Sequence, residues 1–183
     1  MNYSIKIQTL IASKIFILKI FLGILLLAAC AQMSIPFYPV PITFQTLAIL
    51  LISFLYSPKE ALITLCSYVL IGILGAPIFS SFGFGLIRIL GPSGGYIIGF
   101  IFAASISSYI FENFCARRKT MPNILMISII CHSIIYFFGL SHLLQFISLD
   151  KCIYYGFIIF IPTDIIKTLV FTAIFSVFDE KNN

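Results

Sequence analysis

Six long apolar segments, separated by five short breaks, constrain this chain more than any other feature of its sequence. Proline, glycine or charged residues interrupt the apolar sequence at 36–41, 57–60, 80–93, 117–123 and 145–151. The apolar segments between these breaks cover residues 17–34, 44–56, 61–79, 95–114, 124–144 and 153–178. A helix needs about 20 mostly apolar residues to cross a bilayer. The pattern therefore predicts six membrane-spanning helices in a single transmembrane domain over residues 1–183.

The composition excludes a water-soluble globule. Hydrophobic residues make up 61% of the chain and charged residues only 9%, whereas about 25% of the residues in a soluble domain are charged. Disorder is excluded because disordered segments are poor in the Ile, Leu and Phe that dominate here. The segments also lack the alternation of apolar and polar residues that is typical of membrane β-barrels. The expected fold class is an all-α, multi-pass integral membrane protein in the lipid bilayer.

Most of the cations would lie on one side of that bilayer. With a cytoplasmic N-terminus, the inner segments hold eight of the eleven Lys and Arg residues, namely Lys6, Lys14, Lys19, Lys59, Arg117, Arg118, Lys119 and Lys181. Cytoplasmic loops carry such an excess, so we expect both termini in the cytoplasm and the protein in the cytoplasmic membrane. The net charge of +5 then reflects topology, and no nucleic-acid partner is expected. The run Arg117-Arg118-Lys119 is interpreted as a lipid-headgroup anchor.

A cleaved signal peptide over residues 1–34 is an alternative interpretation of the first segment. Lysines precede an apolar run, and Ala29-Cys30-Ala31 resembles a cleavage site. The chain continues directly into further apolar segments, which favours a retained first helix.

Residues that break helices gather on the opposite, outer side. Eight of the eleven glycines fall between Gly72 and Gly99, and Pro36, Pro39 and Pro41 crowd a second stretch. Irregular backbone at membrane depth is tolerated only where it is buried in protein or lines a water-filled cavity. We therefore expect an outward-facing cavity roofed by these two stretches. The proline-rich one, extended by its prolines, is either an aromatic-bearing lid or a stiff connector between helices.

Asp164 and Lys167 form the one charge pair inside an apolar segment. An ionisable residue in a span costs about 2.5–3.5 kcal/mol on insertion scales, and residues three apart share one helix face. A carboxylate is favoured near a helix N-terminus and a lysine is not, so Lys167 needs an acceptor. The pair offers one acceptor and one donor to a small polar solute, with Phe37, Tyr38, Phe79 and Tyr96 as candidate apolar walls. The alternative is a structural ion pair that locks two helices.

Enzymatic and metal sites are not indicated. The sequence contains no H-E-x-x-H, no G-x-S-x-G and no nucleotide-binding loop. Its five cysteines are scattered, and His132 and His142 stand ten residues apart, so we expect both histidines to serve packing. No catalytic residues, no metal and no cofactor are predicted, and the protein is not expected to be an enzyme.

Four motifs of the chain are specific in combination: Pro36-x-x-Pro39-Val40-Pro41-Ile42-Thr43-x-Gln45-Thr46, Gly75-x-Pro77, Leu90-Gly91-Pro92-Ser93-Gly94-Gly95-Tyr96-x-Ile98-Gly99-Phe100 and Pro162-x-Asp164-x-x-Lys167. Together they resemble the BioY family, the biotin-binding S components of energy-coupling factor (ECF) transporters. The resemblance implies a six-helix S-component bundle that captures biotin from outside. It also implies partnership with a transmembrane coupling subunit and two cytoplasmic ATPase subunits, although some members lack a dedicated module.

The resemblance also implies roles for individual residues. Asp164 and Lys167 match the family's polar contacts to the ligand. The segment from Pro39 to Gln45 and the glycine loop that ends at Gly94, Gly95 and Tyr96 match the parts that close over it. A ureido ring agrees with this pair, since its N–H groups suit Asp164 and its carbonyl suits Lys167.

Two departures from the family pattern stand out. Family members usually carry Asn or Ser within a Gly-Gly-x-Gly-Gly stretch, where this chain has Ser81-Phe82-Gly83-Phe84-Gly85. The polar contact expected at Gly83 is missing, and Ser80, Ser81 or Arg88 are candidates to replace it, with Arg88 able to meet a ligand carboxylate. The small residues expected for docking on the first helix are reduced to Ala28, Ala29 and Ala31, with Gly23 a turn earlier. Another small carboxylated vitamin, or a scaffold without solute, are the alternative functions.

Overall fold

The computed structural model describes the backbone of residues 2–115 and 120–180, and the side chains of residues 13–115 and 120–175. Within these residues the fold is nearly all helical. The helices are α1 (Asn2–Gln32), α2 (Gln45–Leu55), α3 (Pro58–Ile73), α4 (Leu86–Leu90), α5 (Gly94–Ile110), α6 (Met121–Leu143), α7 (Leu149–Ile153) and α8 (Ile161–Glu180). A two-stranded antiparallel ribbon pairs β1 (Ser34–Ile35) with β2 (Ile42–Thr43). The predicted headgroup anchor at 117–119 and the cation Lys181 lie outside the described residues.

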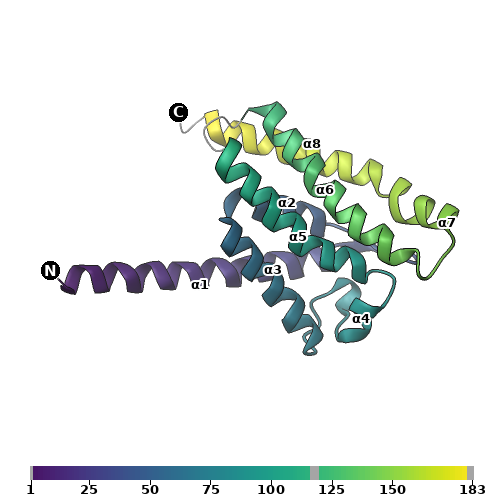
Figure 1. The fold of residues 1–183 in the computed structure, drawn as a ribbon, viewed down its shortest axis with the longest axis horizontal. Coiled ribbons are helices and arrows are strands. Elements are labelled where there is room, and N and C mark those ends of the chain that lie inside the picture. The colour runs from purple at the N-terminus through teal and green to yellow at the C-terminus, as the bar shows by residue number, and fades with distance from the viewer. Residues whose placement is uncertain (1, 116–119, 181–183) are drawn as a thin grey trace.

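The long helices form a bundle with irregular segments at one end. Figure 1 shows α5, α6 and α8 running alongside one another, with α1 crossing beneath them and projecting beyond the bundle. The N-terminal end of α1 and the C-terminal end of α8 lie toward the same end of the molecule, whereas α4 and α7 lie toward the other. The short helices α4 and α7, which follow two of the predicted helix breaks, thus lie at the end of the molecule away from the N-terminal end of α1.

Four helical stretches among the described residues are long and apolar enough to cross a membrane. They are Ser13–Gln32, Gly94–Cys115, Met121–Leu143 and Leu149–Phe175. Helix α2 has 11 residues, which at about 1.5 Å per residue is roughly half the hydrocarbon thickness of a bilayer. Helix α3 ends at Ile73, six residues before the end of the span expected over 61–79. The helix stops there because Gly75 has a φ of 111°, which lies outside the right-handed helical region.

The last apolar segment is also less regular than expected. In place of one helix over 153–178, α7 is followed by a π-helical turn, Tyr154–Ile158, and then by α8. Pro162 stands at the second position of α8, where its missing N–H leaves no helical hydrogen bond unmade. The break therefore places the start of α8, and with it Asp164, inside the bundle.

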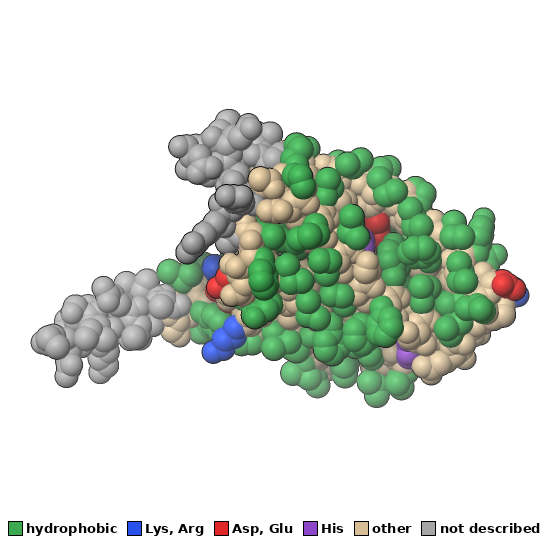
Figure 2. All heavy atoms as spheres, turned by 45° about the horizontal axis from the view of Figure 1, so that its top comes forward, with side chains coloured by type: hydrophobic (Ala, Val, Ile, Leu, Met, Phe, Trp, Pro, Cys, Tyr) green, Lys and Arg blue, Asp and Glu red, His purple; other side chains and the backbone are tan. Residues whose placement is uncertain are grey.

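Large hydrophobic side chains cover the outside of the bundle as well as its core. Leu27, Ile49 and Ile127 are fully buried, whereas Phe21 and Ile129 are more than half exposed. Figure 2 shows hydrophobic side chains over most of the described surface on that face. Soluble monomers rarely expose apolar patches of this extent, so the surface suits surrounding lipid.

Candidate functional site

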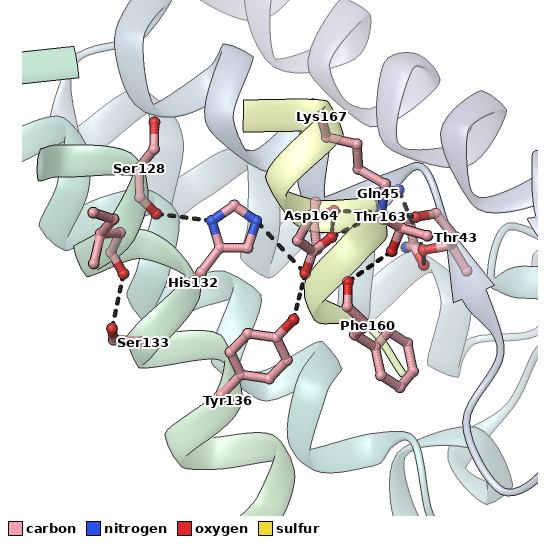
Figure 3. A network of polar contacts seen from close by, with 12 residues as sticks. Thr43, Gln45, Ser128, His132, Ser133, Tyr136, Phe160, Thr163, Asp164 and Lys167 are labelled. Carbon is pink, nitrogen blue, oxygen red and sulfur yellow. Dashed lines mark hydrogen bonds and ion pairs between the residues drawn. The ribbon is translucent and has the colours of Figure 1, made fainter. Parts of the chain in front are cut away.

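The site is centred on the first two turns of α8, which carry Asp164 and Lys167. The Thr163 hydroxyl donates to the carbonyl of Phe160 at 2.8 Å, and the Asp164 backbone N–H donates to the same carbonyl at 3.0 Å. The Asp164 carboxylate therefore lies near the positive end of the helix dipole. Lys167 follows one turn later on the same face, as Figure 3 shows.

The Lys167 ammonium is fully engaged by neighbouring oxygens. Its Nζ donates to Asp164 Oδ1 at 2.9 Å, to the backbone carbonyl of Thr43 at 2.7 Å and to Thr46 Oγ1 at 3.0 Å. A lysine ammonium has three protons to donate, and three acceptors surround it here. The side chain is 7% exposed, so these bonds replace the water that the buried charge has lost. The end of β2 and the first turn of α2 thus fasten onto α8.

The Asp164 carboxylate collects donors from three helices. Oδ1 accepts from Lys167 and from the Thr46 hydroxyl at 3.0 Å, and Oδ2 accepts from the Tyr136 hydroxyl at 2.5 Å. His132 Nε2 lies 3.7 Å from Oδ2. The sequence separations are 118 residues for Thr46 and 28 for Tyr136, so tertiary packing assembles this cluster.

A central cavity of about 50 Å³ lies against the cluster. A single water needs about 10–15 Å³ of such space, so a few waters would fill it. Its lining comes from the proline-rich segment, the glycine loop and helices α2, α5, α6 and α8: Val40, Pro41, Thr43, Gln45, Thr46, Phe79, Ser80, Arg88, Ser93, Tyr96, Ile97, Phe100, Ile135, Tyr136, Phe160, Asp164 and Lys167. The walls are mostly aromatic and aliphatic, with the charged cluster on one side.

Six of the twelve residues predicted for the site line this cavity: Gln45, Phe79, Arg88, Tyr96, Asp164 and Lys167. The amide of Gln45 donates to the Tyr68 hydroxyl at 3.0 Å, and the Tyr96 hydroxyl donates to the Gly156 carbonyl at 2.7 Å. Both polar groups therefore already have partners within the protein. Phe79 is 2% exposed and forms part of the same apolar wall.

Phe37, Tyr38 and Ser81 line a separate outer hollow of about 580 Å³. Tyr38 is 81% exposed, and Phe37 packs against Tyr155 with ring centroids 6.0 Å apart. Arg88 lines both this hollow and the central cavity. Its guanidinium group therefore stands at the boundary between the two spaces.

The three predicted glycines serve close packing and do not line the central cavity. A Cβ at Gly83 would lie 2.3 Å from Arg88 Nε, so the guanidinium lies directly over this backbone. A Cβ at Gly94 would lie 1.6 Å from the Ile89 carbonyl oxygen, and one at Gly95 would lie 2.5 Å from that of Phe138. Gly83 thus leaves room for the Arg88 guanidinium, and Gly94 and Gly95 allow α5 to approach its neighbours.

The altered glycine loop is held by the first helix. The Gln32 amide donates to the Phe79 carbonyl at 3.1 Å, and its oxygen accepts from the Phe82 backbone N–H at 2.9 Å. Ser81 and Phe82 adopt φ values of 55° and 54°, a region that residues other than Gly, Asn and Asp rarely occupy. Two hydrogen bonds from one side chain thus fix a turn in which glycine would be the ordinary residue.

Sequence reasoning missed Thr46, Tyr136 and His132. Each is a polar residue in an apolar helix, and such residues often bond to their own helix, as Ser128 does with Ile124 at 2.9 Å. The one available signal was the spacing of His132 and Tyr136, four apart and so on one face of α6. Among the described residues, no cluster of three or more His, Cys, Asp or Glu side chains could hold a metal ion.

The comparison with known protein families decides the assignment. The model described as "BioY family" matches residues 4–181. The chain belongs to the BioY family. One BioY relative, the "Probable biotin transporter BioY" of Rickettsia prowazekii (strain Madrid E), is 37% identical over 163 residues, which are 87% of this chain and 81% of the relative.

Further relatives are more distant in sequence and cover similar lengths. The "Biotin transporter BioY" of Thermotoga maritima is 32% identical over 146 residues, which are 79% of this chain and 84% of the relative. The crystal structure of "the S-component for biotin from an ECF-type ABC transporter" has a TM-score of 0.70 and 26% identity, and the match covers 95% of this chain and 92% of that one. The BioY chain therefore shares its architecture with a solved S component.

Proposed function

We propose that this BioY chain takes up biotin across the cytoplasmic membrane as the substrate-binding S component of an ECF-type transporter. The observation that carries the proposal is the buried Asp164–Lys167 pair on the wall of the central cavity. Biotin's ureido ring has two N–H donors and one carbonyl acceptor. The carboxylate of Asp164 suits the donors and the ammonium of Lys167 suits the acceptor, and hydrogen bonds to charged groups are the strong ones.

The rest of the cavity suits the rest of the molecule. The rings of Phe79, Tyr96 and Phe160 provide apolar surface for the sulfur-containing ring. Arg88 stands toward the outer hollow, where it would meet the carboxylate at the end of the ligand's aliphatic tail. The ligand would thus lie with its ureido ring deep in the protein and its anionic end toward the outside.

Loading the cavity requires the outer segments to move. About 50 Å³ holds a few waters and is too small for a bicyclic ring system with a tail. Residues 36–41 and the glycine loop contribute Val40, Pro41 and Ser80 to the lining. These segments are the roof that would open, which is the role of a lid.

The proposal includes six spans, with both termini in the cytoplasm, although α2 and α3 are short. The ends of α1 and α8 point toward the same end of the molecule, and eight of eleven cations fall on the proposed inner side. The partners would be a transmembrane coupling subunit and two cytoplasmic ATPase subunits, which would supply energy for transport.

Purification in detergent followed by mass spectrometry of the bound small molecule tests the proposal directly. We expect biotin to copurify and radiolabelled biotin to bind the wild type. Asp164→Asn and Lys167→Ala should both insert in the membrane and lose that binding. Unchanged binding in both variants would refute the site.

Displacement of biotin by another carboxylated vitamin would instead indicate a different ligand. The altered loop at Ser81 makes such a ligand the second candidate. A protein that neither retains nor is thermally stabilised by any small molecule would favour a scaffold.

A further inference from the structure

The segment that follows α3, residues 74–90, separates its polar side chains from its large hydrophobic ones. Its polar side chains are those of Ser80, Ser81 and Arg88. Ser80 lines the central cavity, Ser81 lines the outer hollow, and Arg88 lines both. Every polar side chain of the segment thus lines one of the two spaces of the candidate site.

Five large hydrophobic side chains of the same segment are more than half exposed: those of Leu74, Phe82, Phe84, Leu86 and Leu90. In the described structure, none of these five lines the central cavity or the outer hollow. Leu86 and Leu90 are four residues apart in α4, so they share one face of that helix. An exposed apolar surface of this kind marks a contact with another protein or with a membrane.

The length of α3 sets the depth of this segment in the bilayer. Helix α3 has 16 residues and therefore rises about 24 Å, which is about 6 Å less than the hydrocarbon thickness of about 30 Å. The Gly85 N–H donates to the Gly72 carbonyl at 2.8 Å, so α4 begins beside the last turn of α3 (Figure 1). With the start of α3 at the inner surface, the segment lies where the outer hydrocarbon meets the lipid headgroups.

The exposed apolar surface of α3 continues into the segment. Leu70 and Ile71, near the end of α3, are exposed, and Arg88 is the one charged residue between Leu70 and Leu90 in the sequence. A loop surrounded by water would carry polar side chains on its outside, whereas this segment turns them toward the site. The continuous apolar surface therefore favours lipid, and not water, as the surrounding of residues 74–90.

Phe82 shows most clearly that the segment gains from contacts outside the chain. Its φ of 54° is a conformation that glycine adopts readily and other residues rarely. Because its side chain is exposed, packing within the described part of the protein does not compensate for this backbone. Phenylalanine and leucine are typical of the apolar face of elements that lie in the membrane interface. Contact of the ring with lipid chains would supply the missing compensation.

We propose that residues 74–90 anchor one wall of the site in the outer leaflet of the membrane. The five exposed hydrophobic side chains insert among the lipid chains, while Ser80, Ser81 and Arg88 face the solute. Any movement of this wall during loading then carries those hydrophobic side chains through the lipid interface. The inference rests on the membrane topology of the proposed function, with α3 as a span, and is independent of which solute binds.

Fluorescence quenching in vesicles tests the inference, because the chain contains no tryptophan and a single introduced one reports on its own surroundings. Phe82→Trp, Phe84→Trp and Leu86→Trp are prepared in the full chain and reconstituted in phosphatidylcholine vesicles. Phosphatidylcholines brominated near the headgroup or near the chain ends quench from the lipid, and acrylamide quenches from water. All three variants should emit at short wavelength, be quenched most by bromine near the headgroup, and resist acrylamide.

Two matched variants at other exposed aromatic residues provide the controls. Tyr38→Trp, in the loop between β1 and β2, should be quenched by acrylamide and not by brominated lipid. Phe21→Trp, in the apolar part of α1, should be quenched by bromine near the chain ends. Thermal unfolding checks that each variant keeps the fold.

Reporters at positions 82, 84 and 86 that behave like Tyr38→Trp would overturn the inference. Reporters shielded from both brominated lipid and acrylamide would also overturn it, because a second protein chain would then cover the surface. If bromine fails to quench Phe21→Trp as well, the proposed membrane topology fails with it. Normal quenching at Phe21→Trp therefore separates a wrong anchor from a wrong topology.

Discussion

Two lysine–carboxylate pairs, at different depths of the molecule, show what distinguishes an ordinary ion pair from the candidate site. Lys19 lies 3.1 Å from Glu60, with side chains 40% and 13% exposed, whereas Lys167 lies 2.9 Å from Asp164, with side chains 7% and 8% exposed. Each lysine lies over an aromatic ring, at 5.8 Å from Tyr56 and 5.7 Å from Phe44. Both carboxylates stand in the first turn of a helix.

The two pairs differ in how many tertiary hydrogen bonds each charge needs to replace lost water. Glu60 belongs to a capping box with Ser57, in which each residue bonds to the backbone of the other, and it would stabilise the start of α3 without any lysine. Lys19 remains partly open to its surroundings. Lys167 and Asp164 depend on oxygens and hydroxyls from β2, α2 and α6. The inner pair is thus held by the whole bundle, and the comparison predicts unequal responses to the same chemical change.

Removal of one lysine should show the largest effect. Lys167→Met leaves the Asp164 carboxylate buried without its counterion, which typically costs about 3–5 kcal/mol of the free energy of unfolding, and it should abolish biotin binding. Lys19→Met should cost less than about 1 kcal/mol and leave binding intact. Reversible unfolding in mixed micelles and radiolabelled biotin binding measure the two effects. Equal losses of stability in the two variants would remove the distinction between the pairs.

Removal of one tyrosine hydroxyl should have an intermediate effect. Tyr136→Phe takes a donor from Asp164 Oδ2, and a hydrogen bond to a charged group contributes about 1.5–3 kcal/mol. The dissociation constant for biotin should therefore rise about 10- to 100-fold. The matched variant is Tyr56→Phe, since that hydroxyl donates to the Lys19 backbone carbonyl at 2.6 Å. It should lower stability by about 0.5–1.5 kcal/mol without a change in biotin affinity, and a tenfold change there would contradict the comparison.

The smallest expected effect is that of salt. Raising the ionic strength from about 0.1 M to about 1 M shortens the Debye length from about 10 Å to about 3 Å. The coupling energy between Lys19 and Glu60, obtained from a double-mutant cycle of unfolding free energies, should shrink. That between Lys167 and Asp164 should stay constant, because buried pairs are screened much less. A salt-sensitive inner pair would mean that solvent reaches it.

Local rules predicted the parts of the site that are local in the sequence. Asp164 and Lys167 stand out because charges are rare in apolar segments and because three residues separate them on one helix face. Pro162 stands at the second position of α8, which begins at Ile161, a place in a helix that suits proline. The helix breaks predicted at 36–41 and 80–93 also supply lining residues of the central cavity, among them Val40, Ser80 and Arg88.

Longer-range features could not be read in the same way. Nothing in the spacing of Thr46 and Asp164, 118 residues apart, indicates that their side chains meet. Glycine is ambiguous, because the same residue permits a close ligand and a close helix; Gly95 turned out to pack against α6. Tyr38 was predicted to form part of the apolar wall of the site. It lies in the loop between β1 and β2, and its side chain is exposed on the surface.

The bond between Lys167 and the Thr43 carbonyl has a consequence for how a solute would be loaded. Thr43 ends the ribbon that joins the roof to the bundle, and its oxygen already occupies one of the ammonium's three donor positions. The carbonyl of an arriving solute would replace the Thr43 oxygen, because the Lys167 ammonium has no free donor position. Loading would then exchange one hydrogen-bond partner of Lys167 Nζ for another. The exchange would release β2 from α8, so that binding of the solute would be coupled to movement of the segment between β1 and β2.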